Sequence, residues 1–300
     1  MANNINLITK EELNSLDCPT VETQENSWNA IMKLFDNDET RLKLLVESLG
    51  YGFVRSKLFK PSKEDKSNYN PIYILTVEDE NQSEIKLILK IAEPHPFLER
   101  KNVTNEVAVI NYLRQHSKIP VPLILSYSND KQTSLLGCEY ILMKKVKGRV
   151  LRELIDEKFQ NVNQLPEKII DQMLCLLKEL NSIKFKEEKL GNFDLSMNIV
   201  SDVWPEVEPC EKFLELINKR IDWSIKEMKK IKIYKELVKK IELFQENLNK
   251  IAKENSDLDD FNFNDKMSLV HGDLHAGNIF VDPDTYEITA IIDWEWAHHG

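Results

Sequence analysis

The fold is decided near the end of the chain, by the stretch SLVHGDLHAGNIFVDPDTYEITAIIDWEWA, residues 268–297. Two short apolar runs, NIFV and ITAIID, flank a turn built on DPDT, a pattern that predicts a β-hairpin. Asp273 and Asn278 are five residues apart, across a tight loop that precedes the first strand, and Asp293 ends the second. We therefore expect three oxygen-bearing side chains to converge beside the hairpin.

Phosphoryl transfer requires such a set of side chains. One carboxylate must orient the acceptor hydroxyl and take its proton, while an amide oxygen and a second carboxylate hold Mg²⁺ against the phosphates. The sequence therefore predicts Asp273 as the catalytic base, and Asn278 and Asp293 as the metal ligands.

The combination of HGDLHAGNI and IIDWE resembles the aminoglycoside phosphotransferase and choline kinase superfamily, which shares the protein-kinase fold. It is also similar to the protein-kinase catalytic loop H-R-D-L-x-x-x-N, with the same Asp-to-Asn spacing. His275 replaces the usual protein-kinase lysine, and Trp294 and Glu295 replace Phe-Gly, as is typical of the small-molecule branch. The resemblance implies an α+β, two-lobed fold with a small antiparallel-sheet N-lobe and a mainly helical C-lobe. It also implies ATP- and Mg²⁺-dependent transfer of the γ-phosphate to a hydroxyl of an aminoglycoside-, choline- or sugar-like molecule.

Residues upstream are similar to the same family. The resemblance places Lys90, in LILKI, at the strand lysine that contacts the α and β phosphates, and Glu106, in NEVAVINYL, at its helix partner. The segment EYILMKKVKG resembles the hinge. There the backbone of Lys144 and Val146 would meet adenine, and Met143 would line the pocket.

The nucleotide loop departs from the family pattern. KPSKEDKSNYNP holds no glycine, so the resemblance implies that Ser67 and Asn70 cover the phosphates. The resemblance extends over about residues 50–297.

The chain stops at Gly300, soon after Asp293, whereas relatives usually continue with several helices. We therefore expect a C-terminally truncated chain, with an assembled nucleotide-binding half and an incomplete acceptor site. Apolar faces of Trp294, of Trp296 and of the helices in residues 210–255 would then lack a cover.

Hydrophobic periodicity predicts the other elements. Helices are expected over residues 28–49, 103–116, 150–157 and 167–183, and two packed helices, or else a coiled coil, over 210–255. Strands are expected over residues 51–59, 71–77, 85–91, 123–128 and 138–146. The chain would thus comprise a flexible tail (1–26), a nucleotide-binding N-lobe (27–147) and a helical C-lobe with the catalytic loop (148–300).

Composition limits the partners and the compartment. The formal net charge of −10 argues against a protein whose main task is to hold nucleic acid. The N-terminus carries no apolar run like that of a signal peptide, and no stretch approaches the ~20 apolar residues that span a bilayer. The four cysteines show no metal-binding spacing. We therefore expect a cytoplasmic protein with reduced thiols that binds neither membrane nor nucleic acid.

Several polar residues near the motif have structural interpretations. His271 is expected to brace the catalytic loop, and Asp282 and Asp284 to form the hairpin turn. His298 and His299 are expected to be polar residues after the second strand.

Two other functions compete with a small-molecule kinase. One is a nucleotide-binding, pseudokinase-like regulator without turnover, which the early end of the chain favours. The other is a metallohydrolase in which His271, Asp273 and His275 bind zinc. The zinc hypothesis explains neither Lys90 nor Glu106.

Overall fold

The computed structural model describes residues 39–59, 70–92, 102–159, 162–185, 189–201, 207–230, 234–254 and 267–300. The predicted tail, the N-terminal part of the first predicted helix and Ser67 lie outside these residues.

A five-stranded antiparallel sheet forms from runs rich in β-branched and aromatic residues. Its strands are β1 (Gly52–Phe59), β2 (Ile72–Glu78), β3 (Glu84–Ile91), β4 (Ile124–Ser128) and β5 (Tyr140–Lys144). They lie in the order β1-β2-β3-β5-β4. All five lie where the alternating pattern predicts strands.

The two faces of this sheet have different neighbours. Leu87, Leu89 and the other odd-numbered residues of β3 lie in a core that also contains buried residues of α3 (Thr40–Glu47). Even-numbered residues of β3 point to the opposite face, because successive side chains of a strand alternate. There Ile88 packs with residues of α4 (Asn102–His116). Lys90 shares that face with Ile88.

The predicted hairpin forms a second, three-stranded sheet. Its strands are β10 (Ile279–Val281), β11 (Ile288–Ile291) and β6 (Arg149–Val150), in the order β11-β10-β6. Asp282 accepts backbone hydrogen bonds from Asp284 and Thr285, both at 2.9 Å, which confirms its role in the turn.

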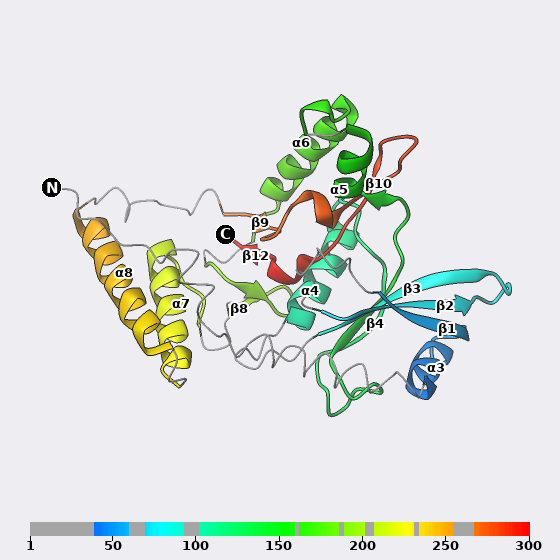
Figure 1. Cartoon of the computed structure of the whole chain (residues 1–300), viewed down its shortest axis with the longest axis horizontal. Helices are drawn as coiled ribbons and strands as arrows, with labels where there is room; N and C mark the ends of the chain where they lie inside the picture. Colours follow the sequence, from blue (N-terminus) through cyan, green and yellow to red (C-terminus); the bar gives the residue numbers. More distant parts are fainter. Residues whose placement is uncertain are drawn as a thin grey trace.

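Helices and short strands complete the molecule (Figure 1). The helices are α5 (Leu151–Leu154), a π-helical turn η1 (Ile155–Phe159), η2 (Val162–Gln164), α6 (Glu167–Ser182), α7 (Phe213–Met228), α8 (Lys235–Glu254), η6 (Ala276–Asn278) and η7 (Trp294–Trp296). The short strands are β7 (Asn192–Phe193), β8 (Ile199–Ser201), β9 (Leu269–Val270) and β12 (His298–His299), paired as β7-β8 and β9-β12. None of the helices in the described ranges is long and apolar enough to span a bilayer.

The run from 210 to 255 forms two packed helices, as predicted. Figure 1 shows α7 and α8 side by side, away from the five-stranded sheet. Asn218 donates a hydrogen bond to Asn249 at 2.8 Å, and Lys229 pairs with Glu242 at 2.8 Å.

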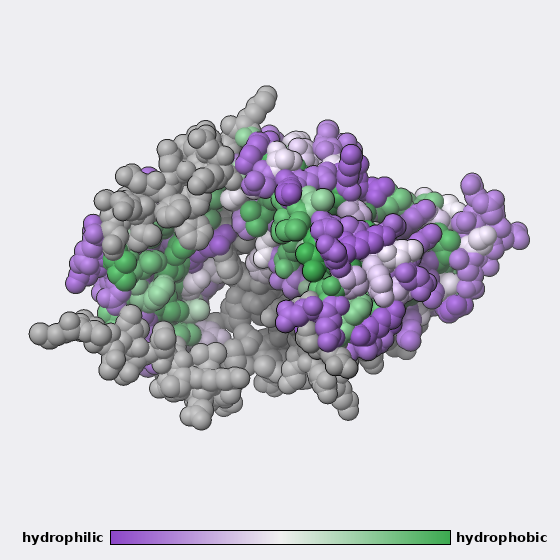
Figure 2. Space-filling model, turned by 90° about the horizontal axis from the view of Figure 1, so that it is seen from above, coloured by the Kyte–Doolittle hydropathy of each residue, from purple (hydrophilic) through white to green (hydrophobic). Residues whose placement is uncertain are grey.

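Two of the helices, α8 and α6, each expose three large apolar side chains. On α8 these are Leu243, Phe244 and Ile251. On α6 they are Ile170, Leu174 and Leu177. Figure 2 shows hydrophobic areas interrupting the hydrophilic surface on the side that α6 occupies. Exposed apolar faces were expected on the helices after residue 210, and of these α8 has exposed large apolar side chains.

The segment after Asp293 corrects two predictions. Trp294 is fully buried in a core that includes residues of α4 and α6, so its expected uncovered face is absent; Trp296 is half-buried. His299 is not simply a polar residue after the strand. It is buried, and it pairs with Leu269 of β9. Both differences arise because the chain turns back at η7 and pairs with β9.

Candidate active site

Lys90 lies at the centre of the site. Its Nζ lies 2.8 Å from Oε2 of Glu106, which α4 directs toward the sheet. Both side chains are buried. The resemblance implied this strand-to-helix ion pair, and the two residues are in contact.

Two further carboxylates surround the same ammonium group. Lys90 Nζ lies 2.6 Å from Asp293 Oδ1 and 3.1 Å from Glu295 Oε2. Carboxylate oxygens of Glu106, Asp293 and Glu295 all lie within 4.8 Å of one another. Glu295 was not among the predicted site residues. The available signal was its position, two residues beyond Asp293, where a single turn returns the chain to the same place.

The charges in this cluster shift one another's pKa values. Burial opposes the charge on Lys90, but the carboxylates of Asp293, Glu106 and Glu295 hold its pKa well above the ordinary 10.5. Burial raises the pKa of Glu106 from 4.5 to about 7, against the opposing effect of Lys90. Burial also acts to raise the pKa of Asp293, but Lys90 outweighs it and holds that pKa below 3.8. Of the two carboxyl groups, Asp293 is therefore the more firmly ionised and Glu106 the less.

The catalytic loop places Asp273 beside Asn278. Asn278 is buried, and its Nδ2 donates to the backbone oxygen of Asp273 at 3.0 Å and to its Oδ2 at 3.4 Å. The side chain of Asp273 is 44% exposed, so an incoming molecule can reach it. The loop therefore presents a carboxylate to solvent while an amide fixes its backbone.

The buried side chain of His271 holds this loop in place. Its Nδ1 accepts a hydrogen bond from the backbone N–H of Asp273 at 3.2 Å, and its Nε2 lies 3.0 Å from the carbonyl oxygen of Ile292. Burial lowers the pKa of His271, which favours the neutral ring that this arrangement needs. Both ring nitrogens are engaged, so the geometry does not support His271 as a zinc ligand.

His275 caps the short helix η6. Its Nδ1 accepts a hydrogen bond from the backbone N–H of Gly277 at 2.9 Å, and its Nε2 lies 3.6 Å from Asp273 Oδ2. The ring therefore lies beside the proposed base. Among the described residues, the side chains spaced like the ligands of a metal ion are the three carboxylates around Lys90, those of Glu106, Asp293 and Glu295. His275 and Asp273 do not belong to that cluster.

Backbone conformation at two positions shapes the site. Gly272 has a φ of 82°, and a Cβ there would lie 2.2 Å from the carbonyl oxygen of Trp296. Asp293 has a φ of 67°, in the left-handed region that L-residues seldom occupy. Such strain at a non-glycine residue is typical of functional sites and is maintained by the surrounding contacts, here the ion pair with Lys90.

Asn105, on α4, holds the site's supporting segments together and was also not predicted. Its Nδ2 donates to the carbonyl oxygens of Glu295, at 3.2 Å, and Ala297, at 2.8 Å. Its Oδ1 accepts a hydrogen bond from the backbone N–H of Phe193 at 2.9 Å. One buried amide thus joins α4 to η7 and to β7.

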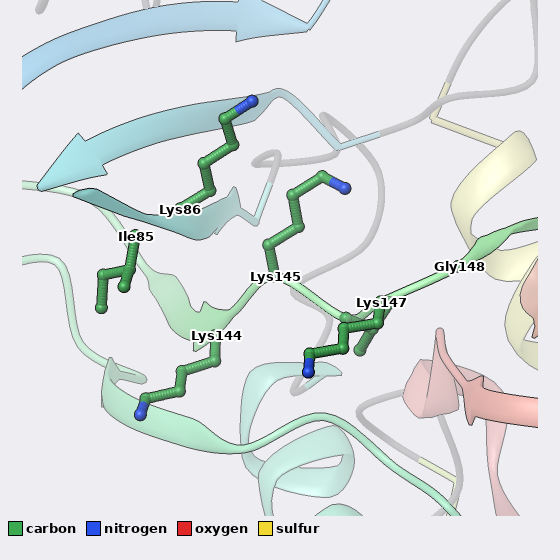
Figure 3. A pocket seen from close by; sticks show the side chains of 7 residues that line it. Ile85, Lys86, Lys144, Lys145, Lys147 and Gly148 are labelled. Atoms are coloured by element: carbon green, nitrogen blue, oxygen red, sulfur yellow. The ribbon is translucent and has the colours of Figure 1, made fainter. Parts of the chain in front are cut away.

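The predicted hinge borders two cavities. One, of about 460 Å³, is lined by Ile85, Lys86 and residues 144–148 (Figure 3). The other, of about 410 Å³, lies against residues 121–123, 144–147 and 287–289. Lys144 and Val146 line both cavities, as do Lys145 and Lys147, and the predicted contact of Lys144 and Val146 with adenine stays a prediction.

Two other predicted nucleotide-binding residues lie elsewhere. Met143 is buried in the core between the sheet and α4, so it does not line either hinge cavity. Asn70 donates a hydrogen bond from Nδ2 to Oε2 of Glu295 at 2.9 Å, which places it at the carboxylate cluster. The predicted phosphate contact of Ser67 cannot be located, since that residue lies outside the described ranges.

The donor set suits a magnesium ion, which prefers carboxylate and amide oxygens. Asp293 supplies an ionised carboxylate. Asn278 uses its Nδ2 toward Asp273, which leaves its amide oxygen as a ligand. Glu295 adds a third oxygen donor close to Asp293. The residues present therefore fit the metal that the resemblance implies.

A strand lysine paired with a helix glutamate, next to a loop bearing Asp273 and Asn278, is the set of residues that the protein-kinase-like fold brings together. The chain belongs to the phosphotransferase enzyme family (APH), whose family model matches residues 65–300.

Solved structures agree on the fold. A Ralstonia eutropha protein described as a candidate aminoglycoside phosphotransferase superposes with a TM-score of 0.51 at 17% identity, over 88% of this chain and 66% of that one. The two-lobed kinase-like fold is thereby confirmed. An aminoglycoside-3'-phosphotransferase of type VIII gives a TM-score of 0.44 at 15% identity, over 87% of this chain and 79% of that one.

A curated relative matches a shorter segment. A subtelomeric hrmA-associated cluster protein of Aspergillus fumigatus is 30% identical over 90 residues, which are 30% of this chain and 17% of that protein. The chain therefore spans less than a fifth of this relative.

Proposed function

We propose that the protein transfers the γ-phosphate of ATP, with Mg²⁺, to a hydroxyl of a small molecule that is aminoglycoside-, choline- or sugar-like. The observation that carries this proposal is the joining of Lys90, Glu106 and Asp293 through contacts of 2.6 and 2.8 Å. These residues come from a strand, a helix and the hairpin end, and only a phosphoryl-transfer site explains all three together with Asp273 and Asn278.

The proposed roles follow from the contacts. Asp273, exposed and fixed by Asn278, orients the acceptor hydroxyl and takes its proton as the oxygen attacks phosphorus. Lys90, held in place by Glu106, neutralises phosphate oxygens of the nucleotide. Asn278, Asp293 and Glu295 would hold Mg²⁺, which supplies charge neutralisation at the phosphates.

The compartment and partners are part of this proposal. Cys138 and Cys175 form no disulfide, which supports a cytoplasmic location. The net charge of −10 supports a small-molecule acceptor over nucleic acid.

Replacing Asp273 tests the proposal. Asp273→Asn should keep the affinity for Mg-ATP nearly intact and lower turnover by on the order of 10² or more, because the positioned base is lost. Turnover would be measured as ATP consumption with choline, ethanolamine, sugars, homoserine and aminoglycosides as acceptors. Asp282→Asn, in the hairpin turn, is the control and should retain activity. Equal turnover by the Asp273→Asn variant and the parent would remove Asp273 from the mechanism.

A nucleotide-binding protein with weak turnover is the second candidate. The buried pair of Lys90 and Glu106 favours it, because the role of that pair requires a bound nucleotide and no acceptor. Calorimetry with Mg-ATP separates the two functions. Binding that depends on Asp293, without turnover on any acceptor, would favour the second.

A further inference from the structure

Asn70 reaches the carboxylate cluster from a distant part of the chain. Its Nδ2 donates a hydrogen bond to Oε2 of Glu295 at 2.9 Å, although 225 residues separate the two in the sequence. Asn70 comes directly before β2, whereas Glu295 lies in η7, after the hairpin. The resemblance implied that Asn70 covers the phosphates, whereas its amide here has a carboxylate as a partner.

The backbone that follows Asn70 fixes its position. Pro71 comes next, and a residue before proline is restricted to extended conformations. The N–H of Ile91 donates to the carbonyl oxygen of Pro71 at 2.9 Å, and Ile72 pairs with Lys90 in the sheet. Asn70 therefore enters β2 opposite the end of β3 that bears Lys90.

The side chain of Glu295 depends on Asn70 for its hydrogen bonding. Within the described ranges its carboxylate accepts one hydrogen bond, and Asn70 donates it. Lys90 Nζ lies 3.1 Å from the same Oε2 and adds an opposite charge. The hydrogen bonds that Lys90 donates in the cluster go to Glu106, at 2.8 Å, and to Asp293, at 2.6 Å. Asn70 is thus the group that sets how the Glu295 carboxylate is turned.

The main chain of Glu295 is held separately. Asn105 donates to the carbonyl oxygens of Glu295 and Ala297 at 3.2 and 2.8 Å. These bonds fix where Glu295 lies, but a glutamate side chain still rotates about several bonds of its own. The hydrogen bond from Asn70 limits that rotation at the carboxylate itself.

A carboxylate that is held by one oxygen keeps its other oxygen available. Asn70 and Lys90 both engage Oε2 of Glu295, so Oε1 remains for a cation. A residue that hydrogen-bonds to a metal ligand orients that ligand, and its loss typically lowers metal affinity by roughly 10- to 100-fold. The contact between Asn70 and Glu295 has the form of such a supporting bond.

We propose that Asn70 is a positioning residue for Glu295, whose Oε2 it holds so that Oε1 stays available to Mg²⁺. This assignment rests on the proposed function, in which Glu295 is a metal ligand. It places the effect of Asn70 on the metal, whereas a residue that covers the phosphates would act on the nucleotide directly.

Calorimetry with adenylyl imidodiphosphate, an ATP analogue that is not hydrolysed, separates these two roles. The dissociation constant is measured without divalent metal and with saturating Mg²⁺, and the ratio of the two values is the gain in affinity due to the metal. Asn70→Leu has a side chain of similar size without the amide donors. It should lower that gain roughly tenfold or more and leave metal-free binding unchanged.

A double-variant cycle shows whether Asn70 acts through Glu295. Glu295→Gln should lower the gain by at least as much as Asn70→Leu does. Asn70→Leu/Glu295→Gln should lose no more than Glu295→Gln alone, because two residues that act through one contact are not additive. Asn81→Leu, in the exposed turn between β2 and β3, is the matched control and should keep the gain of the parent.

The contrary outcomes differ from one another. A gain in Asn70→Leu equal to that of the parent, or additive losses in the double variant, would overturn the role of Asn70 through Glu295 and leave the proposed function standing. Equal weakening with and without Mg²⁺ would assign Asn70 to the phosphates. A parent that does not bind the analogue would contradict the proposed function, and this assignment with it. Urea unfolding checks that each variant is folded, and Asn70→Ala is measured alongside Asn70→Leu.

Discussion

Gly272 determines the path of the catalytic loop, and its replacement is a test at the scale of one residue. Gly272→Ala should lower the free energy of unfolding by about 3 kcal/mol, because a left-handed φ and a clash 2.2 Å from the Trp296 oxygen act together. Gly50→Ala is the matched control: φ is 83°, but the space around it is open, so about 1 kcal/mol is expected. Urea unfolding measures both. Equal losses would show that the close approach to Trp296 is unimportant.

Glu106 should make stability depend on pH. Its pKa in the folded protein is about 7 and its ordinary value is 4.5, so the folded state holds a proton that the unfolded state releases between these values. The resulting stability is complete below about pH 4.5 and is lost as pH rises through about 7. Relative to Glu106→Gln, the parent should lose up to about 3 kcal/mol across this window.

Denaturant unfolding of the parent and of Glu106→Gln at half-unit pH steps measures that difference. The variant is its own control, since an amide does not titrate. A difference that stays constant from pH 4.5 to 7 would contradict the raised pKa of Glu106.

The predictable site residues are those that lie in a recognisable local pattern. Asp273, Asn278 and Asp293 share one loop and hairpin, and Lys90 and Glu106 belong to sequence patterns of their own. Asn105 could not be found this way. Its partners are 88 to 192 residues away along the chain, and nothing near it in the sequence indicates them.

Among the elements, α8 offers the clearest test of the exposed apolar surface. Phe244→Ser/Ile251→Ser should change the free energy of unfolding by less than about 1 kcal/mol, since both side chains are half exposed, at 54% and 48%. Val238→Ser, on the same helix but only 4% exposed, should cost about 2 kcal/mol or more. Thermal unfolding and light scattering measure stability and self-association. A loss from the double variant as large as that from Val238→Ser would show that this surface is covered.

Elements with a strong period were predicted, and elements made by distant pairing were not. The long helices and the five strands of the main sheet follow from side-chain spacing. The two-residue strands β9 and β12 have no period to detect. They exist because His299 pairs with Leu269 after the chain has turned at η7. The same turn buries Trp294. From the sequence, Trp294 was expected to follow the strand and to have an uncovered apolar face.

Lys90 joins the sheet, α4 and the segment after the hairpin, so its loss should affect the whole molecule. Lys90→Met should lower the free energy of unfolding by roughly 3–5 kcal/mol, because it leaves three neighbouring carboxylates without a cation. Mg²⁺ should restore part of that loss by replacing the positive charge. Thermal unfolding with and without MgCl₂ measures both effects.

Lys86→Met is the control for this experiment. It removes an exposed lysine from the same face of β3 and should change stability by less than about 0.5 kcal/mol. If Mg²⁺ raised the melting temperature of all three proteins equally, the carboxylates around Lys90 would not be a metal site.

The hydrogen bonds of Asn105 also limit which residues can replace it as the family evolves. The side chain at this position must donate two hydrogen bonds and accept one, and a single short, planar amide group does all three. Aspartate cannot donate, leucine can do neither, and glutamine carries the same amide one carbon further out. Any substitution here would therefore need a second change in η7 or β7 at the same time. Among natural variants that keep this arrangement, position 105 should be one of the slowest to evolve, although it touches no substrate.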